Sequence, residues 1–347
     1  MSHYVFDPKF EGPPVVVVEM SGNHSSSLDK ALDFARAVKE SGGDYLKVQC
    51  YKASTITINC STDDFKVDKN SPWFSDNTLY SLYDSAHTPW EWIEEIFKLC
   101  DQIDLPVFAS PFDTTSIEFL ESLGCPIYKI ASPEIVDLSL IKKCAETGKP
   151  IVLSTGLASQ DEIQEAIETI NKYHNRIIIL KCVSAYPTPM SDINVSTIPW
   201  LKNNFSLPAG LSDHTLGSAA AIAATALGAV MIEKHFKLDD DTTSIDEAFS
   251  MKIGELASFK QQLLDVHTSV GKPTLEIPKS AASSISGRRS LYAVKDIKIG
   301  ERFTHDNIKS VRPGYGLHPR HLDEIIGICA PRDFCKGDRL TEDLLPN

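Results

Sequence analysis

The chain has 347 residues, a hydrophobic content of 42%, a charged content of 23% and a formal net charge of −13. A chain of this length can bury a large core, in one domain or in two. Its acidity argues against general binding to nucleic acids or anionic membrane surfaces, and it lacks the run of roughly 18 apolar residues that would span a bilayer.

The N-terminus and the cysteines indicate the cellular compartment. The first residues lack a basic segment followed by an apolar one, so we expect no secretory signal. The eight cysteines form no Cys-x-x-Cys pair and have no zinc-like spacing. We therefore expect reduced thiols, no disulfide framework and a cytoplasmic protein.

Short β-branched runs alternate with longer amphipathic stretches along the first 270 residues. The predicted strands are Val15–Val18, Tyr45–Val48, Val107–Ala109, Ile127–Ile130, Ile151–Leu153, Ile177–Leu180, Ala209–Leu211 and Ala229–Ile232. The predicted helices include Leu28–Glu40, Pro89–Gln102, Thr115–Leu123, Leu138–Thr147, Gln160–Tyr173, Ala219–Leu227 and Ile253–Val270. Eight strands that alternate with helices favour an α/β fold of the closed (β/α)8 TIM barrel type over an open doubly wound sheet.

Two segments interrupt this alternation. Residues 50–88 separate the second predicted strand from the next helix and contain several aromatic side chains, among them Trp73. Loops of this length are commonly functional or partly folded, and we expect the aromatics to pack the loop down. Pro, Ser and Gly then dominate residues 271–287 and predict a linker. The expected domains are a barrel over residues 1–270, the linker over 271–287 and a small β-rich domain over 288–347.

Two histidines follow predicted strands that lie next to each other. His214 stands in Gly-Leu-Ser-Asp-His-Thr and His235 in Val-Met-Ile-Glu-Lys-His-Phe, with a predicted helix between them. In a parallel sheet both side chains would leave the carboxyl ends of adjacent strands, roughly 5 Å apart at the backbone. Two neutral imidazoles at that spacing can hold one divalent cation. The alternative is that each histidine only caps its strand through a hydrogen bond.

Other polar side chains also follow predicted strands, at the edge where (β/α)8 barrels carry their chemistry. They are Glu19, Lys47, Gln49, Ser110, Lys129, Ser132, Ser154, Lys181, Ser184, Tyr186, Ser212, Glu233 and, in the last loop, Asp246. Lys47 and Lys129, together with several hydroxyls, offer point charges and directed donors for a small anion such as a phosphate ester. Helix amino termini behind Ser132 and Ser154 would add partial positive charge. The alternatives are lysines in salt bridges and serines that cap helices.

These residues fall in segments that resemble the sialic acid synthase family, whose members condense phosphoenolpyruvate with an N-acetylated amino sugar. The segments are Glu19-x-x-x-Asn23-His24, Lys47-Val-Gln49, Ser110-Pro-Phe112, Tyr128-Lys129-Ile-Ala-Ser132, Ser154-Thr-Gly156, Tyr186-Pro187-Thr-Pro189, Gly210-Leu-Ser-Asp-His214-Thr and Ile232-Glu-Lys-His235-Phe. They run through the whole predicted barrel. The tail, with Gly287-Arg-Arg-Ser-Leu-Tyr and Val311-Arg312-Pro313-Gly314, resembles the family's antifreeze-like (SAF) domain.

Two further segments, residues 79–92 and 310–319, are similar to the pseudaminic acid synthase branch of this family. This similarity implies a 2,4-diacetamido-2,4,6-trideoxy hexose as the sugar. N-acetylneuraminate and N,N'-diacetyllegionaminate synthesis are the alternatives within the family. More distant alternatives are a Schiff-base aldolase on the same barrel, with Lys129 as the nucleophile, a keto-deoxy sugar phosphate synthase, and a carbohydrate- or partner-binding protein without catalysis.

The resemblance also implies roles for single residues. Phosphoenolpyruvate would be bound by Lys47, Lys129, Ser132, Ser154, Ser184 and Ser212, with Ser110 and Glu233 in the same substrate site. A divalent metal cation, Mn²⁺ or Mg²⁺, would be held by His214 and His235. The sugar would be positioned, or proton transfer assisted, by Glu19, Gln49, Tyr186, Asp246 and Arg312. Because the tail has a marginal core, we expect a domain-swapped homodimer in which Arg312 reaches the partner subunit's barrel.

The sequence departs from the family pattern in the loop after Asn23-His24, where three serines stand in place of a common glycine. Ala109 and Val183 likewise replace hydroxyl residues. These departures would alter local donors to the phosphate without removing the lysines or the histidines.

Overall fold

The computed structural model describes residues 3–69, 71, 73–74 and 78–345. It divides into two compact units, Met1–Gly271 and Lys272–Asn347, and each unit has its own hydrophobic core. Among the described residues, no helix combines the length and the apolar character needed to cross a membrane.

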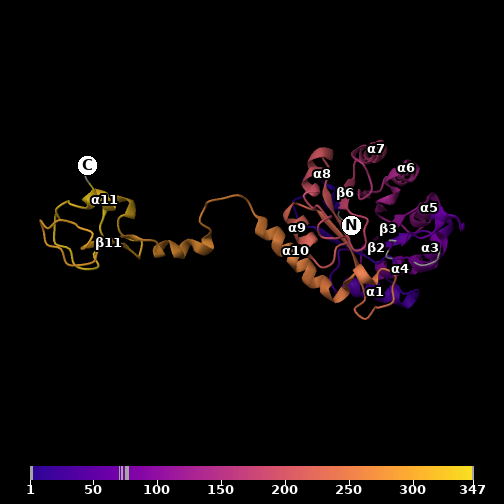
Figure 1. The fold of residues 1–347 in the computed structure, drawn as a ribbon, viewed down its shortest axis with the longest axis horizontal. Coiled ribbons are helices and arrows are strands. Elements are labelled where there is room, and N and C mark those ends of the chain that lie inside the picture. The colour runs from indigo at the N-terminus through magenta and orange to yellow at the C-terminus, as the bar shows by residue number, and fades with distance from the viewer. Residues whose placement is uncertain (1–2, 70, 72, 75–77, 346–347) are drawn as a thin grey trace. The chain divides into compact units, whose positions relative to one another are not determined.

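Eight parallel strands form a closed barrel at the centre of the first unit (Figure 1). They are β1 (Val15–Glu19), β2 (Tyr45–Cys50), β3 (Val107–Pro111), β4 (Tyr128–Ile130), β5 (Ile151–Ser154), β6 (Ile177–Cys182), β7 (Ala209–Asp213) and β8 (Met231–Lys237). Each strand pairs with the next along the chain, and β8 also pairs with β1, with Glu19 opposite His235. A short strand, β9 (Met251–Lys252), pairs with the end of β8. The prediction of a closed (β/α)8 barrel is therefore confirmed.

Helices surround the barrel (Figure 1). They are α1 (Leu28–Glu40), α2 (Ala53–Ile56), α3 (Leu79–Ala86), α4 (Trp90–Gln102), α5 (Thr114–Ser122), α6 (Leu138–Glu146), α7 (Gln160–Asn171), α8 (Thr197–Phe205), α9 (Ala219–Ala226) and α10 (Leu256–Val270). Side-chain caps explain where several begin: Ser27 accepts a hydrogen bond from the backbone N–H of Lys30, and Ser159 forms a capping box with Glu162.

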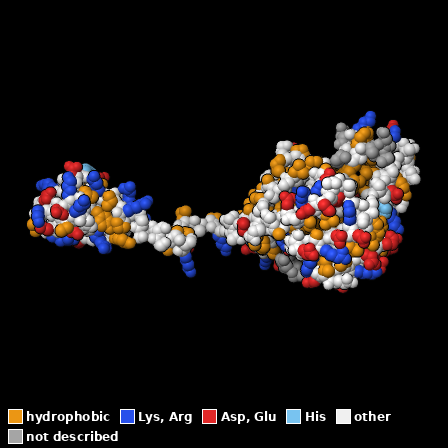
Figure 2. Space-filling model, turned by 90° about the horizontal axis from the view of Figure 1, so that it is seen from below, with side chains coloured by type: hydrophobic (Ala, Val, Ile, Leu, Met, Phe, Trp, Pro, Cys, Tyr) orange, Lys and Arg blue, Asp and Glu red, His pale blue; other side chains and the backbone are white. Residues whose placement is uncertain are grey.

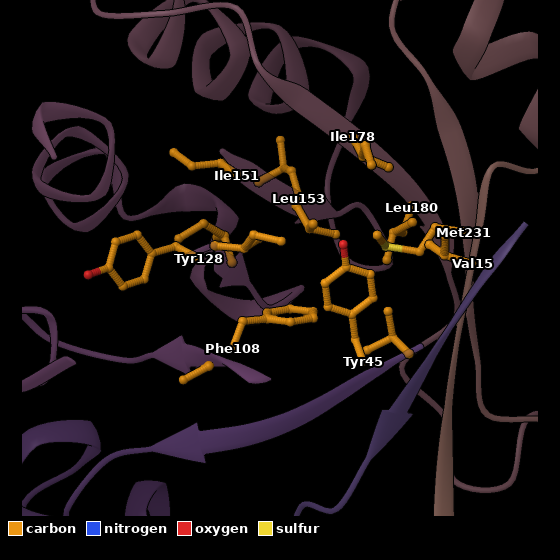
Figure 3. Packing of buried hydrophobic residues seen from close by; sticks show 14 of the residues in the cluster. Val15, Tyr45, Phe108, Tyr128, Ile151, Leu153, Ile178, Leu180 and Met231 are labelled. Carbon is orange, nitrogen blue, oxygen red and sulfur yellow. The ribbon is translucent and has the colours of Figure 1, made fainter. Parts of the chain in front are cut away.

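Apolar side chains fill the barrel interior below its carboxyl edge. Val15, Tyr45, Phe108, Leu180 and Met231 come from five different strands and gather there (Figure 3). Side chains two residues apart on a strand share a face, so the residue two positions further along lies in the same interior, nearer the edge. A polar layer therefore lies above the apolar layer, nearer the carboxyl edge, with Lys47 above Tyr45 and Glu233 above Met231.

The residues between these inward-facing positions lie under the helices. Lys234 and Asp213 are both buried, and Lys234 Nζ lies 2.8 Å from Asp213 Oδ2 and 2.5 Å from the Thr215 carbonyl oxygen. Removing one partner of a fully buried ion pair leaves an uncompensated charge, which costs several kcal/mol. Asp213 belongs to β7 and Lys234 to β8, so this ion pair links the carboxyl ends of the two strands that carry the candidate histidines.

The structure differs from the sequence predictions at several element ends. Every barrel strand except β4 runs farther toward its carboxyl end than predicted, because the added residues stay paired with neighbouring strands, and β8 begins two residues later than predicted. The long segment 50–88 contains α2 and α3, which the sequence analysis did not predict. A 3-10 helix, Lys279–Gly287, occupies part of the predicted linker.

The second unit has one antiparallel strand pair, β10 (Ser290–Ala293) with β11 (Ile308–Val311), and a short helix, α11 (Leu322–Ile325). Its core includes Leu291, Phe303 and Phe334. On the face of each unit that Figure 2 shows, acidic and basic side chains are interspersed. A nucleic-acid binding surface instead gathers Lys and Arg on one face, so the face in view does not have that pattern.

Candidate active site

A cavity of about 50 Å³ lies at the carboxyl ends of the barrel strands. The residues predicted from the sequence that line it are Glu19, Lys47, Gln49, Ser110, Lys129, Ser132, Ser154, Tyr186, Ser212, His214, Glu233 and His235. Each of the eight strands, or the loop that follows it, contributes to this lining. Closure of the barrel thus brings together most of the predicted site residues.

Two lysines and two glutamates form a buried charged cluster in this cavity. Lys47 Nζ lies 2.9 Å from Glu19 Oε2 and 3.5 Å from Glu233 Oε2. Lys129 Nζ lies 3.0 Å from Glu233 Oε1, which also accepts a hydrogen bond of 3.0 Å from Ser212 Oγ. The sequence analysis left open whether these lysines face a ligand or form salt bridges. They do both: Lys47 and Lys129 line the cavity and pair with glutamates.

The electrostatics of the cluster favour an incoming anion. Burial raises the pKa of Glu19, and the charge of Lys47 only partly opposes this shift. Burial works in the same direction at Glu233, but the charges of Lys129 and Lys47 outweigh it and lower the pKa of this carboxyl to about 2. A proton taken up by Glu19 would leave two ammonium groups facing one carboxylate. The cluster can then accept negative charge from a ligand.

Three serines add hydroxyl groups beside the lysines. Ser132 Oγ accepts a hydrogen bond from the backbone N–H of Gly156 at 3.0 Å and does not cap the helix that follows it. The Oγ atoms of Ser154 and Ser184 are buried and have no hydrogen-bond partner among the described residues. A Cβ at position 156 would lie 2.9 Å from Ser132 Oγ and 3.0 Å from Ser184 Oγ, so both hydroxyls lie beside Gly156. Buried hydroxyls without partners are expected where a polar ligand completes the site.

The expected helix amino termini are not both found: a short helix follows Ser132 directly, but none begins directly after Ser154. The segment after Ser132 is a four-residue 3-10 helix, Pro133–Val136, and α7 begins only at Gln160, where Ser159 caps it. Because a four-residue 3-10 helix has only a small dipole, the ammonium groups and hydroxyls provide most of the positive field of this site.

The two histidines stand side by side, with ring centroids 5.4 Å apart. Nδ1 of His214 lies 2.8 Å from the Val183 carbonyl oxygen, so this nitrogen donates and Nε2 keeps its lone pair. Nδ1 of His235 is buried and has no hydrogen-bond partner in the described part of the chain. Burial, helped by the neighbouring His214, lowers the pKa of His235 well below its ordinary value and keeps the ring neutral.

Neutral imidazoles with free lone pairs fit a divalent cation. Within the described residues, no group of three or more His, Cys, Asp or Glu side chains could hold a metal ion. The protein would therefore coordinate a cation through the two imidazoles, and substrate oxygens and water would complete the coordination.

A second cavity, of about 320 Å³, adjoins the first and shares Gln49, Tyr186 and His235 with it. Asp246, predicted to contact the sugar, lines this second cavity. Its Oδ2 accepts a hydrogen bond of 3.2 Å from the backbone N–H of Gly22, and burial raises its pKa. Together the two cavities form a space with a small charged end, at the lysines and glutamates, and a larger end lined by both polar and apolar side chains.

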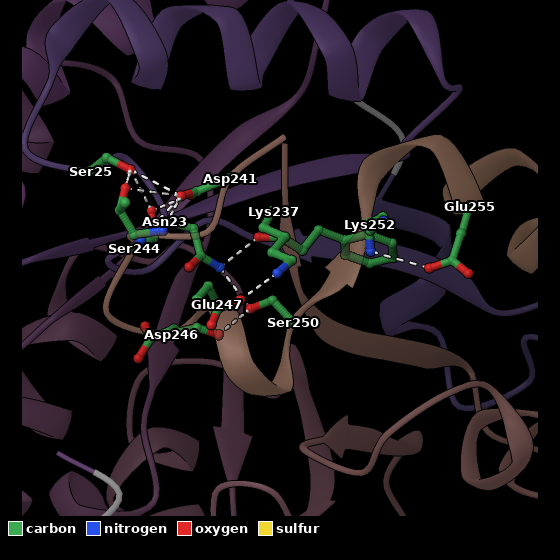
Figure 4. A network of polar contacts seen from close by, with 12 residues as sticks. Asn23, Ser25, Lys237, Asp241, Ser244, Asp246, Glu247, Ser250, Lys252 and Glu255 are labelled. Atoms are coloured by element: carbon green, nitrogen blue, oxygen red, sulfur yellow. Dashed lines mark hydrogen bonds and ion pairs between the residues drawn. The ribbon is translucent and has the colours of Figure 1, made fainter. Parts of the chain in front are cut away.

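The loop after β1 holds the loop after β8 in place (Figure 4). Asn23 Nδ2 donates to the Phe236 carbonyl oxygen at 2.6 Å and to Ser250 Oγ at 2.7 Å. Ser25 Oγ lies 3.1 Å from Asp241 Oδ1. Ser25 also has a φ of 46°, in the left-handed region that glycine adopts without strain, so the departure from glycine has a structural cost that these bonds offset. The two loops in turn position Asp246.

Cys182 lines the first cavity, and its Sγ lies 4.0 Å from His214 Nδ1. The sequence analysis did not predict it as a site residue, because it follows an apolar run that conceals its place at a strand end. Trp73 lines the second cavity and also packs 5.1 Å from Tyr186, so it has both the packing contact that we expected and a ligand-facing position. Arg312 is exposed and belongs to the second unit.

Comparisons with known proteins agree with these observations. The profile of the NeuB family matches residues 34–274, and that of the SAF domain matches residues 288–346. The chain belongs to the NeuB family. It is 45% identical to the pseudaminic acid synthase of Helicobacter pylori, over 95% of this chain and 97% of that protein. It is 40% identical to the pseudaminic acid synthase of Campylobacter jejuni, over 94% of this chain and 95% of that protein.

A solved structure supports the same family assignment. The N-acetylneuraminic acid (sialic acid) synthetase of Leptospira borgpetersenii, solved in complex with citrate, aligns with a TM-score of 0.69 and 28% identity. The alignment covers 79% of this chain and 91% of that one. The family resemblance drawn from the sequence motifs is therefore confirmed.

Proposed function

We propose that this member of the NeuB family is a pseudaminic acid synthase. It condenses phosphoenolpyruvate, 2,4-diacetamido-2,4,6-trideoxy-L-altrose and water to a nine-carbon nonulosonic acid and phosphate. The observation that carries the proposal is the similarity, over nearly the whole chain, to pseudaminic acid synthases of two organisms. The two adjoining cavities support it, because one suits a phosphate ester and the other has room for a hexose.

Phosphoenolpyruvate binds in the cavity that contains the lysine–glutamate cluster. Lys47 and Lys129 pair with its charges, and the hydroxyls of Ser132, Ser154 and Ser184 donate to its oxygens. Ser110 and Ser212, which contact Lys47 and Glu233, hold these side chains in place.

The open-chain sugar lies in the second cavity with its aldehyde at the histidines, where the two cavities meet. Gln49, Tyr186 and Asp246 position it there. His214 and His235 would hold Mn²⁺ or Mg²⁺, and the chemistry that such a cation supplies is Lewis-acid polarisation of a carbonyl oxygen. C3 of phosphoenolpyruvate forms the new carbon–carbon bond to the aldehyde carbon, whose oxygen takes up the proton held by Glu19 and becomes a hydroxyl.

Glu19 also acts in the second half of the reaction. Bond formation at C3 leaves cationic character at C2 of the former phosphoenolpyruvate, and water adds to this carbon. In this half Glu19, which has lost its proton to the sugar oxygen, accepts the proton of that water, a role that suits a buried carboxyl with a raised pKa next to an ammonium group. The tetrahedral intermediate then expels phosphate by cleavage of the C–O bond.

A phosphate-release assay with a panel of sugars tests the proposed function. With phosphoenolpyruvate and Mn²⁺, we expect turnover of 2,4-diacetamido-2,4,6-trideoxy-L-altrose and little with N-acetylmannosamine. Mass spectrometry of the product identifies the nine-carbon acid. Preferred turnover of N-acetylmannosamine or of the sugar precursor of N,N'-diacetyllegionaminate would assign the chain to another branch of the family.

A Schiff-base aldolase on the same barrel is the second candidate. Burial lowers the pKa of Lys129, next to the opposing charge of Glu233, and a lowered lysine pKa is what imine formation requires. Borohydride reduction in the presence of substrate separates the two functions. A covalent adduct on Lys129 would support the aldolase, and its absence with full phosphate release supports the synthase.

The proposal includes a cytoplasmic homodimer in which the SAF domain of one subunit serves the barrel of the other. All eight cysteines carry free thiols, as expected in a reducing compartment. The second unit is small, and a small domain gains stability by docking on a larger body. Arg312 precedes a Pro-Gly turn and is exposed, so its guanidinium is free to bond to oxygens of the sugar in the partner subunit.

Subunit complementation tests this arrangement. Arg312→Ala has an intact barrel and a defective arm, whereas His214→Ala has the reverse, and each homodimer is expected to be inactive. After subunit exchange, half of the dimers are mixed and each has one intact site, so about a quarter of the wild-type activity should return. If the arm served its own chain, mixing would restore no activity.

A further inference from the structure

Strands β7 and β8 stop pairing one residue before the two candidate histidines. Asp213 lies opposite Lys234 in the last pair of their register. His214 and His235 are the next residues along the chain in each case. Nδ1 of His214 bonds to the Val183 carbonyl oxygen, and Nδ1 of His235 has no partner among the described residues. Neither nitrogen links the two rings, so the residues beside them must set their separation.

Lys234 contacts both chain neighbours of His214. Its Nζ lies 2.8 Å from Asp213 Oδ2 and 2.5 Å from the Thr215 carbonyl oxygen. Asp213 Oδ1 accepts hydrogen bonds from the backbone N–H and from Oγ1 of Thr215, at 2.9 and 2.8 Å. Asp213 and Thr215 are thus bonded to each other across His214. Both are also bonded to Lys234, which directly precedes His235 in the chain.

This network is buried and does not face the substrate site. Asp213, Thr215 and Lys234 are each at most 1% exposed, and none of them lines either of the two cavities. Away from water, charge-assisted hydrogen bonds are strong and fix the groups that they join. Stability alone is a weak explanation for such a pair, because apolar side chains of similar size often give an equally stable protein. The network can act on the reaction only through the position of its neighbours.

We propose that Asp213 and Lys234 are positioning residues that hold His214 and His235 at the separation at which both imidazoles bind one divalent cation. The inference rests on the proposed function, which places the cation at these histidines. Residues that orient metal ligands without touching the metal contribute about 10- to 100-fold to metal affinity. Without the network, the two strands lose their link beside the histidines, and Mn²⁺ binding weakens by that factor.

The double variant Asp213→Asn/Lys234→Met tests this role. It removes both charges together, so no unpaired charge stays buried. The first substitution keeps an acceptor for Thr215, and the second keeps most of the side-chain length. Calorimetry with Mn²⁺ alone should show a Kd about 10- to 100-fold above that of the wild type. Affinity for phosphoenolpyruvate, measured in EDTA, should not change. An unchanged Kd for Mn²⁺ would overturn the inference.

Asp44 and Lys260 provide a matched control pair at the amino ends of β1 and β2. Lys260 Nζ lies 2.7 Å from Asp44 Oδ1 and bonds to the Gly42 carbonyl oxygen, and Asp44 Oδ2 accepts from the backbone N–H of Val16. This pair also joins an ammonium group to a carboxylate and a backbone carbonyl, but far from the histidines in the barrel. Asp44→Asn/Lys260→Met should leave Mn²⁺ affinity unchanged. Equal losses of affinity in both double variants would indicate a general effect on folding and overturn the inference.

Cu²⁺ separates failure of this inference from failure of the proposed function. Imidazoles bind Cu²⁺ more tightly than Mn²⁺, and electron paramagnetic resonance counts the bound nitrogens without turnover. The wild type should give a two-imidazole signal that His214→Ala lacks, and Asp213→Asn/Lys234→Met should need about 10- to 100-fold more Cu²⁺ to give it. This result in a protein that neither binds Mn²⁺ nor releases phosphate would contradict the proposed function and support the inference.

Two results of the Cu²⁺ titration would overturn the inference. One is a wild type without the two-imidazole signal, and the other is a double variant that gives this signal at the same Cu²⁺ concentration as the wild type. Circular dichroism checks that each variant is folded. Asp213→Leu/Lys234→Met, which replaces the ion pair with apolar contact, is the second variant if the first fails to fold.

Discussion

Replacing His214 or His235 with alanine is expected to lower kcat/KM on the order of a thousandfold or more while the fold is retained. The two rings lie with centroids 5.4 Å apart, each can offer a nitrogen lone pair, and the remaining ring alone cannot hold a divalent cation firmly. Mn²⁺ titration by calorimetry provides a readout that does not depend on turnover. Binding should be lost in both variants, and circular dichroism should show unchanged secondary structure.

The same site predicts how chelation and pH act. EDTA should abolish activity, and added Mn²⁺ should restore it. Although burial alone would lower the pKa of His214, its contacts with Cys182 and the Val183 carbonyl raise the pKa above its ordinary value. A proton on His214 competes with the cation, so the apparent affinity for Mn²⁺ should weaken as pH falls. Full activity after exhaustive chelation would rule out a metal on these histidines.

Replacing Lys129 with methionine should weaken phosphoenolpyruvate binding by about 2–3 kcal/mol, or roughly 30- to 150-fold in Kd. The variant keeps the length of the side chain but removes the ammonium group that pairs with the anion. It also leaves Glu233 with Lys47 as its remaining cationic neighbour, which makes the cavity more repulsive to negative charge. Lys47→Met should act in the same direction.

Lys181→Met is the matched control for these two variants. Lys181 stands on β6, next to the site in sequence, but its Nζ lies 3.1 Å from the Cys182 carbonyl oxygen and it does not line the cavity. Phosphoenolpyruvate affinity should therefore be unchanged. Equal affinities in the wild type, Lys47→Met and Lys129→Met would contradict the placement of the anion.

Local sequence signals located most elements of the barrel. Helix α1 was predicted to the residue, because Ser27 caps its start and the apolar period ends before Ser41 and Gly42. Strand ends were predicted less well: β8 continues through His235 to Lys237, although Lys234 interrupts the apolar run. Only pairing with β1 and the buried bond to Asp213 make a lysine acceptable there.

Helix α3 is an element that the local sequence did not predict at all. Its stripe of Leu79, Leu82 and Ala86 is short and lies among polar residues, so the sequence analysis treated segment 50–88 as a loop. Whether such a stripe packs against protein or borders a cavity depends on what stands opposite it. That neighbour is the barrel edge, formed by residues far away along the chain.

The sequence by itself determined the alternation of strands and helices, the motifs that identify the family, and the residue types available for chemistry. These depend on local periodicity and on side-chain identity, which are both readable along the chain. Only the tertiary structure decided that Glu19 and Glu233 pair with Lys47 and Lys129, that Ser132 and Ser184 both lie beside Gly156, and that leucines of α3 line the second cavity. The physical reason is that charge, desolvation and cavity shape depend on distances in space, and closure of the barrel sets those distances between residues that the sequence keeps far apart.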